Sequence, residues 1–203
     1  MESYLTLAGE LRHEGPKVKG SRFVATVAPV TDEEEAKALL ARVRRELHDA
    51  RHHGSAWRLG PAGDRFRSSD DGEPSGSTGK PILAAIEGRE LTDVAVIVTR
   101  WFGGTKLGVG GLVRAYGGAA AEALDLAPVL RVELRRRFRL RFPYECTGPV
   151  QGMLSELGLE PEGGDWGEEV ELRLAVPLGQ CEVLLAAFTE RTAGRGAIQE
   201  LEP

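Results

Sequence analysis

The glycine-rich segment that follows Arg100 constrains the fold more than any other part of the chain. It comes after the apolar run Val94–Val98, which is typical of a buried strand. It leads into Leu112–Leu126, where apolar and small residues recur at helical spacing. Several glycines and one charged residue, Lys106, lie between the two. The pattern predicts a buried strand joined to a packed helix through a glycine-rich turn.

Two explanations account for these glycines. Glycine is entropically costly to order, so a cluster of them indicates that something approaches the backbone closely. A glycine-rich turn before a helix also directs N–H groups outward, which suits an anion such as phosphate. Tight packing of the strand against the helix, without any ligand, is the alternative. For the first explanation, the candidate anion-binding residues are Arg100, Gly103, Gly104, Lys106, Gly108, Gly110, Gly111, Arg114 and Lys80.

Composition limits the class of protein. A chain of 203 residues suits one large domain or two small ones, and its net charge of −5 gives no general electrostatic attraction to nucleic acid. Any such role therefore needs a local basic patch. Asparagine is absent and arginine greatly outnumbers lysine, which favours a hot habitat or a GC-rich genome.

The cysteines and the apolar runs indicate a soluble cytoplasmic protein. Cys146 and Cys181 are the only cysteines, too few for a zinc cage or a secreted disulfide scaffold. No basic segment leads into an apolar stretch at the N-terminus, as a signal peptide would require. The longest strictly apolar run, Val183–Phe188, is too short to cross a membrane. We expect neither a metal nor a cofactor.

Charge balance and a proline near residues 127–131 predict a linker between two domains, at 1–130 and 131–203. The first domain reads as α+β, with an N-terminal capping box formed by Thr31 and Glu34. Its expected elements are strands at 4–7, 22–27, 55–59 and 94–98 and helices at about 36–48, 82–86 and 112–126.

The second domain reads as β-α-β-β-α-β, the ferredoxin-like arrangement. Its expected elements are strands at 132–142, 159–165, 169–176 and 197–201 and helices at 147–157 and 180–191. Alternation along the first strand places Val132, Leu134, Phe138, Leu140 and Phe142 on one face and Arg135, Arg137, Arg139 and Arg141 on the other. The arginine row is either an ordinary solvated strand face or a surface that binds a ligand.

The sequence does not match three familiar catalytic or nucleotide-binding motifs. Pro74–Pro81 resembles a phosphate-binding P-loop, but Pro74 replaces its first glycine and Pro81 replaces the hydroxyl residue that holds magnesium. Val113 stands where a dinucleotide-binding fingerprint beginning at Gly108 needs its third glycine. The G-x-S-x-G elbow of serine hydrolases is absent. Nucleotide hydrolysis and serine hydrolysis therefore have little support.

Carboxylates and histidines form a second candidate group. Asp70, Asp71 and Glu73 could bind a metal or exchange protons, or they could serve as local acceptors in a turn. His52 and His53 are adjacent, so on a strand they point to opposite faces, and one of them could join the carboxylates in a pocket. The spacing lacks the pattern of a metal site.

Three segments together resemble the IMPACT family, in particular its bacterial YigZ-like branch: 49–57, 69–81 and 100–116. The resemblance covers essentially the whole chain in order. It implies an N-terminal domain similar to the second domain of small-subunit ribosomal protein five. It also implies a C-terminal ferredoxin-like domain similar to the last domain of elongation factor G. Many relatives carry cysteine where this chain has Gly54, so thiol catalysis is disfavoured here.

Two functional hypotheses follow. The first is a non-enzymatic protein linked to translation that binds RNA or the ribosome. The second is an enzyme that acts on a phosphorylated small molecule at the loops 70–80 and 100–111. Eukaryotic relatives regulate translation by competing for the activator of an initiation-factor kinase. That kinase system is not bacterial, so we do not carry this role over. Both hypotheses require the two loops to lie on one face of the N-terminal domain.

Overall fold

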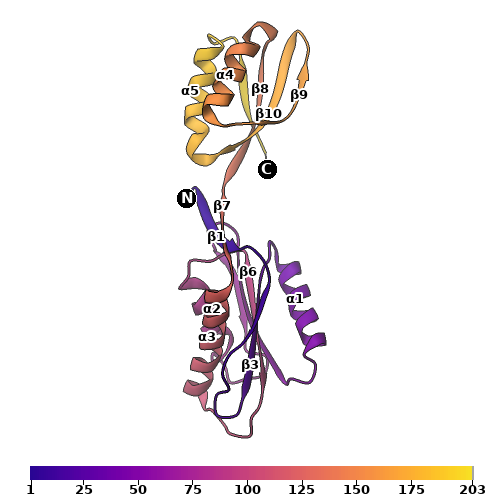
Figure 1. Cartoon of the computed structure of the whole chain (residues 1–203), viewed down its shortest axis with the longest axis vertical. Helices are drawn as coiled ribbons and strands as arrows, with labels where there is room; N and C mark the ends of the chain where they lie inside the picture. The colour runs from indigo at the N-terminus through magenta and orange to yellow at the C-terminus, as the bar shows by residue number, and fades with distance from the viewer. Residues whose placement is uncertain (203) are drawn as a thin grey trace. The chain divides into compact units, whose positions relative to one another are not determined.

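A computed structural model describes residues 1–202 as an α+β protein with separate N-terminal and C-terminal sheets. The chain divides into two compact units, with Ser3–Val132 forming the first and Glu133 beginning the main part of the second. Figure 1 shows the helices and strands of each unit. No helix in residues 1–202 is both long enough and apolar enough to cross a membrane.

The N-terminal unit is built on a five-stranded antiparallel sheet in the order β2-β3-β6-β4-β5. The strands are β2 (Leu11–Glu14), β3 (Arg22–Pro29), β4 (His52–Leu59), β5 (Arg65–Ser69) and β6 (Val94–Trp101). β6 is the central strand, and its apolar run Val94–Val98 is almost fully buried because helices cover both faces of the sheet. This agrees with the expectation from the sequence.

One face of this sheet packs on α1 (Glu33–Glu46), and the other packs on α2 (Gly79–Glu87) and α3 (Val109–Leu126). The start of α1 differs from the prediction by one residue. Asp32, rather than Thr31, caps the helix by accepting from the Glu35 N–H at 2.8 Å. Glu35, rather than Glu34, reaches back, and it accepts from the Thr31 N–H at 2.8 Å, one residue before the cap. The predicted Thr31–Glu34 capping box is therefore wrong, although a related pair of contacts, from Asp32 and Glu35, closes the start of the helix.

The predicted linker near residues 127–131 is instead mostly strand. β7 (Val129–Glu133) pairs with β1 (Ser3–Leu7) in a two-stranded sheet. Consequently the single strand predicted over 132–142 is wrong. It divides into β7 and β8, and only the apolar residues from Phe138 onward are buried in the core. Strand β2 also escaped prediction, because four residues with mixed polarity carry little periodic signal.

The C-terminal unit has the predicted order of elements. These are β8 (Arg135–Pro143), α4 (Thr147–Leu157), β9 (Pro161–Trp166), β10 (Glu169–Pro177), α5 (Cys181–Arg191) and β11 (Ala197–Leu201), with one-turn helices at Tyr144–Cys146 and Leu178–Gln180. All pairings are antiparallel in the order β11-β8-β10-β9. Both helices pack on the face of the sheet that carries Phe138, Leu140 and Phe142. Arg135, Arg137, Arg139 and Arg141 of β8 lie on the opposite face, whereas Arg136 falls by alternation on the same side as Phe138.

Candidate functional site

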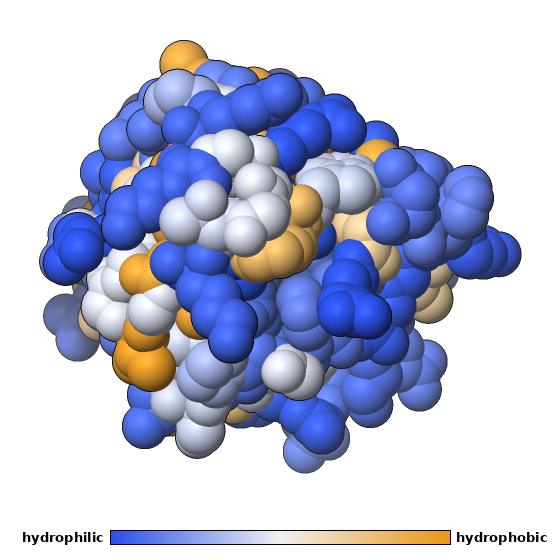
Figure 2. Space-filling model, turned by 90° about the horizontal axis from the view of Figure 1, so that it is seen from below, coloured by the Kyte–Doolittle hydropathy of each residue, from blue (hydrophilic) through white to orange (hydrophobic). Residues whose placement is uncertain are grey.

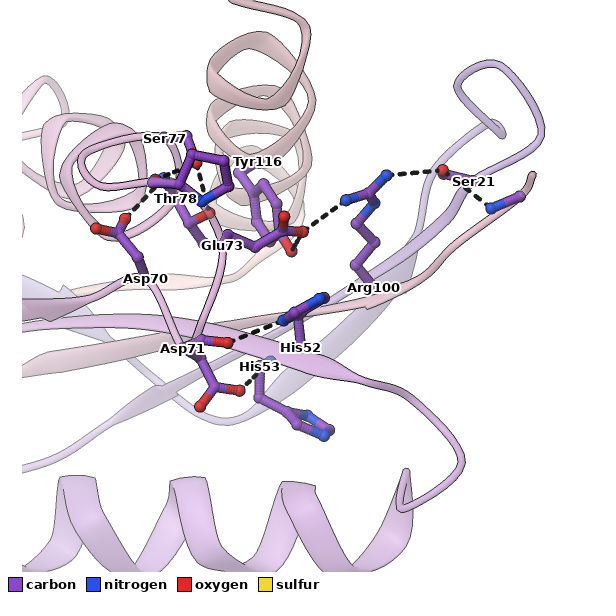
Figure 3. A network of polar contacts seen from close by, with 12 residues as sticks. Ser21, His52, His53, Asp70, Asp71, Glu73, Ser77, Thr78, Arg100 and Tyr116 are labelled. Atoms are coloured by element: carbon purple, nitrogen blue, oxygen red, sulfur yellow. Dashed lines mark hydrogen bonds and ion pairs between the residues drawn. The ribbon is translucent and has the colours of Figure 1, made fainter. Parts of the chain in front are cut away.

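A tight turn organises the carboxylate group between β5 and α2. The Glu73 N–H donates to the Asp70 carbonyl at 3.1 Å, and the two central residues, Asp71 and Gly72, have φ of +46° and +82°. A turn with positive φ at both centres favours an Asp-Gly pair, because glycine adopts this conformation freely and aspartate tolerates it. The turn points its three carboxylates at three separate sets of partners, as Figure 3 shows.

Asp70 acts as a local acceptor for the start of α2. Its carboxylate accepts from the N–H groups of Gly76 at 2.7 Å, Thr78 at 2.9 Å and Gly79 at 2.8 Å. Burial alone would raise the pKa of Asp70, but these donors and nearby Lys80 outweigh it and lower the pKa below its ordinary value. Asp70 is therefore a structural cap, as the turn explanation expected.

Glu73 is the centre of a buried polar network. Its Oε1 accepts from Arg100 Nη1 at 2.6 Å and from the Tyr116 hydroxyl at 2.9 Å. The side chains of Glu73 and Arg100 are each only 6% exposed. Burial, and then the charge of Glu73, raises the pKa of Tyr116 far above its ordinary value, so its hydroxyl stays protonated and donates. The network ties the carboxylate turn to β6 and α3.

The far side of Arg100 is joined to the glycine-rich turn through Ser21. Arg100 Nη2 donates to Ser21 Oγ at 3.3 Å, and the Gly103 N–H donates to the same oxygen at 3.2 Å. A Cβ on Gly103 would lie 1.9 Å from the carbonyl carbon of Gly20. The backbone at Gly20 therefore approaches Gly103 closely. Packing within the chain, and not a ligand, explains the glycine at this position.

The two histidines point to opposite faces of the sheet, as expected for a strand. His52 Nδ1 donates to the Asp71 carbonyl at 2.9 Å, which fixes the tautomer of the neutral ring and leaves Nε2 as an acceptor. His53 is buried on the other face, where Nδ1 lies 3.1 Å from Thr99 Oγ1. Burial lowers the pKa of His53 against the attraction of Asp71, so its neutral form is favoured.

The remaining glycines of the turn leave the start of α3 accessible. Gly104 and Gly108 have positive φ, and a Cβ on either would have no neighbour within 4 Å. Gly108 precedes the helix without a side-chain cap, and the first turn contains no acidic residue. In contrast, α1 begins with three glutamates in its first turn. The positive end of the α3 dipole is therefore left uncompensated by acidic side chains.

Two exposed cations accompany that helix end. Lys106 lies two residues before Gly108, and an Arg114 Nη1 lies 3.9 Å from the Cβ position of Gly110 in the first turn. Neither Lys106 nor Arg114 has a carboxylate within 4 Å among residues 1–202. Lys80 is also exposed, and its side chain lies next to Gly76, in the loop that precedes α2. We call the segment 102–111, together with Arg114, the glycine-loop end.

Sequence reasoning missed an aromatic residue at this end. Phe102 is 56% exposed, with the Arg100 guanidinium 5.6 Å from its ring centroid, and Val109 is exposed to the same extent. Figure 2 looks at this end of the N-terminal unit and shows pale and orange residues scattered among hydrophilic ones. The sequence did contain a signal for this residue. An aromatic side chain inside a polar, glycine-rich turn has no hydrophobic core to pack into, so it is expected at the surface.

The Arg100–Glu73 ion pair brings the two predicted loops together at their bases. It also corrects the role expected for Arg100. Arg100 was predicted to offer its charge to a phosphate, with an internal ion pair to Asp70 or Asp71 as the alternative. It is buried and paired, but its partner is Glu73, which is itself buried and so is not free to act as a pocket acid. The predicted groups that remain available to a ligand are Lys80, Lys106, Arg114 and the backbone of the glycine loop.

Gly54 lies directly under this network. A Cβ on Gly54 would lie 1.8 Å from Thr78 Cγ2 and 3.4 Å from Tyr116 Cε1. Cysteine at this position therefore does not fit beside Thr78 without rearrangement. Glycine at position 54 is therefore matched to the size of the Thr78 side chain in this chain.

The model of the Impact N-terminal domain matches residues 19–124, which include every residue of the network and the glycine-loop end. The chain belongs to the IMPACT family. It is 45% identical over 179 residues to "IMPACT family member in pol 5'region" of Thermus thermophilus, covering 88% of this chain and 97% of that one. It is 35% identical to IMPACT family member YigZ of Escherichia coli, covering 99% of this chain and 98% of that one.

A solved structure described as a hypothetical protein matches the whole chain. Its TM-score is 0.71 at 33% identity, and the match covers 100% of this chain and 98% of the other. The similarity of this IMPACT family member to bacterial relatives thus extends through both units, beyond the matched N-terminal domain.

Proposed function

We propose that this IMPACT family member is a cytoplasmic, non-enzymatic protein that binds RNA within the translation apparatus, with the glycine-loop end as a phosphate contact. The observation that carries the proposal is the start of α3, where Lys106 and Arg114 accompany a helix end that has no acidic residue. Cations at the positive end of a helix dipole are unfavourable in the free protein. An anion placed there offsets the positive charges of the two side chains and of the helix end. It also accepts hydrogen bonds from the unpaired N–H groups.

The exposed Phe102 ring favours a nucleic acid over an isolated phosphate. A base can stack on an exposed aromatic ring whatever its sequence, while cations nearby hold the backbone. The buried Glu73–Arg100–Tyr116 network holds the base of the loop, so less entropy is lost when a ligand orders it. RNA binding should accordingly be weak and tolerant of sequence.

The folds of the two units support the same role by analogy. The order of strands in the C-terminal sheet fits the ferredoxin-like domain implied by the family resemblance. We propose that the N-terminal unit corresponds to the second domain of ribosomal protein five and the C-terminal unit to the last domain of elongation factor G. Both of those domains work on the ribosome, although analogy of fold alone does not transfer function.

The alternative is an enzyme for a phosphorylated small molecule, and it would need a deep cavity at these loops. A cavity of about 450 Å³ in the N-terminal unit lies elsewhere and is lined by Tyr4, Arg58, Glu87, Glu90 and Thr92. At the loops themselves, Arg100 and Glu73 neutralise each other and Asp70 caps a helix. These contacts favour the polymer over the small molecule.

The test is a salt titration of the full chain with a fluorescently labelled single-stranded RNA, followed by anisotropy. We expect the double variant Lys106→Ala/Arg114→Ala to reduce the slope of log affinity against log salt by about 1.4, which corresponds to about 0.7 for each lost phosphate contact. Phe102→Ala should weaken binding by roughly tenfold without changing the slope, because stacking releases no counterions.

Arg45 and Arg65 provide a matched control. Both are exposed, lie on α1 and β5, and have no carboxylate within 4 Å among residues 1–202. The variant Arg45→Ala/Arg65→Ala changes net charge equally and should leave the slope nearly unchanged. Binding that is insensitive to salt, or equally weakened in both double variants, would contradict the proposed contact.

A further inference from the structure

A row of arginines occupies the face of the C-terminal sheet opposite α4 and α5. We call Arg137, Arg139, Arg141 and Arg173 the arginine face. Alternate residues of a strand are about 6.8 Å apart, so the three on β8 span roughly 14 Å. Arg173 on β10 lies directly opposite Arg139 in the register. Figure 1 shows both helices of the unit on the other side of the sheet.

The pairing of Arg139 with Arg173 is electrostatically unfavourable in the free protein. Like charges directly opposite each other on neighbouring strands repel and destabilise the pair. Glu171 is the nearby carboxylate, but it hydrogen-bonds only Arg141, at 2.9 Å. Its distances to Arg139 Nε and Arg173 Nε are 3.5 and 3.7 Å, too long for good hydrogen bonds. Arg139 and Arg173 are thus within ion-pair distance of Glu171, but neither guanidinium makes a hydrogen bond to it.

Negative charge is unevenly distributed over this face. Glu171 faces Arg141 across the strands, and Asp165 lies next to Glu171 in the register. At the other end, Arg137 has Glu162 at 3.5 Å. Arg137, Arg139 and Arg173 still outnumber the two carboxylates nearest to them, Glu162 and Glu171, so this segment is the more positive end. In addition, Arg139 Nε is buried and has no hydrogen-bond partner among the described residues, so an acceptor is missing there.

The chemistry of the face favours a phosphodiester backbone over an acidic peptide. Arginine presents a planar fork that binds phosphate oxygens in pairs and also stacks on bases. The register places Gln199, Ala175 and Gly163 among the arginines. Leu201, opposite Arg137, is a lone half-buried apolar residue there and does not make the cluster of large apolar anchors on which peptide recognition depends. A regularly charged polymer matches a regularly charged row better than a folded protein surface does.

We infer, on the basis of the RNA-binding function proposed above, that the arginine face holds the phosphodiester backbone of single-stranded RNA through Arg137, Arg139 and Arg173. Phosphate oxygens satisfy the open forks and remove the repulsion between Arg139 and Arg173. Glu171 lies within ion-pair distance of Arg139 and Arg173 and competes with the RNA for these two arginines. It therefore weakens RNA binding and positions the side chains when no RNA is present.

The experiment compares two triple variants of the full chain in the same salt-titrated anisotropy assay, with a labelled oligouridine as the probe. In Arg137→Gln/Arg139→Gln/Arg173→Gln we expect the slope to fall by about 2, and the affinity at 0.1 M salt to fall by up to roughly a hundredfold. The control is Arg136→Gln/Arg191→Gln/Arg195→Gln. Those three arginines are exposed, belong to the same unit and pair with Glu200, Glu156 and Glu145.

A second variant is expected to bind RNA more tightly, an effect that unfolding of the variant protein would not produce. Glu171→Gln removes the competing carboxylate and keeps the size of the side chain. We expect it to bind oligouridine about fivefold more tightly at 0.1 M salt, which equals one additional phosphate contact. Unchanged or weaker binding by Glu171→Gln overturns the competition between Glu171 and RNA.

The outcomes separate this inference from the proposed function. If the wild-type chain does not bind oligouridine, both fail. If the glycine-loop variant loses binding but the arginine-face variant behaves like its control, the proposed function stands and the arginine face is excluded. Labelled polyglutamate serves as a second probe. Loss of polyglutamate binding with unchanged RNA binding in the arginine-face variant would assign the face to an acidic protein instead.

Discussion

Arg100 and Arg139 show how burial changes the meaning of the same chemistry. Each is an arginine on a central strand with a glutamate beside it. In the N-terminal unit both partners are 6% exposed, and Glu73 accepts from Arg100 at 2.6 Å. In the C-terminal unit Glu171 is 24% exposed, and no hydrogen bond joins it to Arg139. A buried charge must be paired to be tolerated, whereas an exposed one remains available to a partner.

The largest effect should come from removing the buried partner. Glu73→Ala leaves Arg100 charged and unpaired inside the protein and also removes the acceptor of Tyr116. We expect the free energy of unfolding to fall by about 3–5 kcal/mol, measured by urea denaturation. Tyr116→Phe, which removes only one hydrogen bond, should cost about 1 kcal/mol. Equal effects of the two variants would mean that the network is not held by the ion pair.

The next effect tests how tightly the buried region is packed. Gly54→Ala places a methyl group against Thr78 Cγ2, and we expect a loss of about 1–3 kcal/mol in unfolding free energy. Thr78→Ser removes that Cγ2 and keeps the hydroxyl, so the pair Gly54→Ala/Thr78→Ser should recover most of the loss. A double-mutant cycle measures the coupling. Additive effects would refute the predicted collision.

A partly buried carboxylate should give an intermediate effect with a defined pH dependence. Asp70→Asn keeps one acceptor but introduces an amide among three N–H donors, and should cost about 1 kcal/mol near neutral pH. Because folding lowers the pKa of Asp70, its contribution is complete above the unfolded value of about 3.8. It is lost as pH falls through the folded value. Urea midpoints of wild type and variant should therefore converge below pH 3.8.

The smallest effect on stability should come from the exposed face. The hydrogen bond from Arg141 lowers the pKa of Glu171, but solvent screens these charges. Glu171→Ala leaves Arg139 and Arg173 facing each other without their nearest carboxylate, so we expect a small decrease in the urea midpoint, well below that of Glu73→Ala. A loss comparable to that of Glu73→Ala would show that the arginine face is a structural network and would remove the contrast between the two units.

Much of the fold was predictable because its signals are local. The apolar run of β6, the helical spacing in α3 and the alternation along β8 each arise within one element. Boundaries were less well predicted. The connection at 127–131 contains a proline and reads as a linker, yet most of it forms β7 through pairing with β1, more than a hundred residues earlier in the chain. A pattern of neighbouring residues contains no information about a strand partner so distant in the sequence.

The candidate site divides in the same way. The sequence by itself determined that residues 70–80 and 100–111 are polar and glycine-rich, and that Arg135, Arg137, Arg139 and Arg141 share a face of one strand. Only the tertiary structure decided that Arg100 is withdrawn from solvent by Glu73, while Phe102, Lys106 and Arg114 stay exposed. The physical reason is that periodicity fixes which face a side chain occupies. Its burial, and hence the fate of its charge, depends on which distant segments pack against that face.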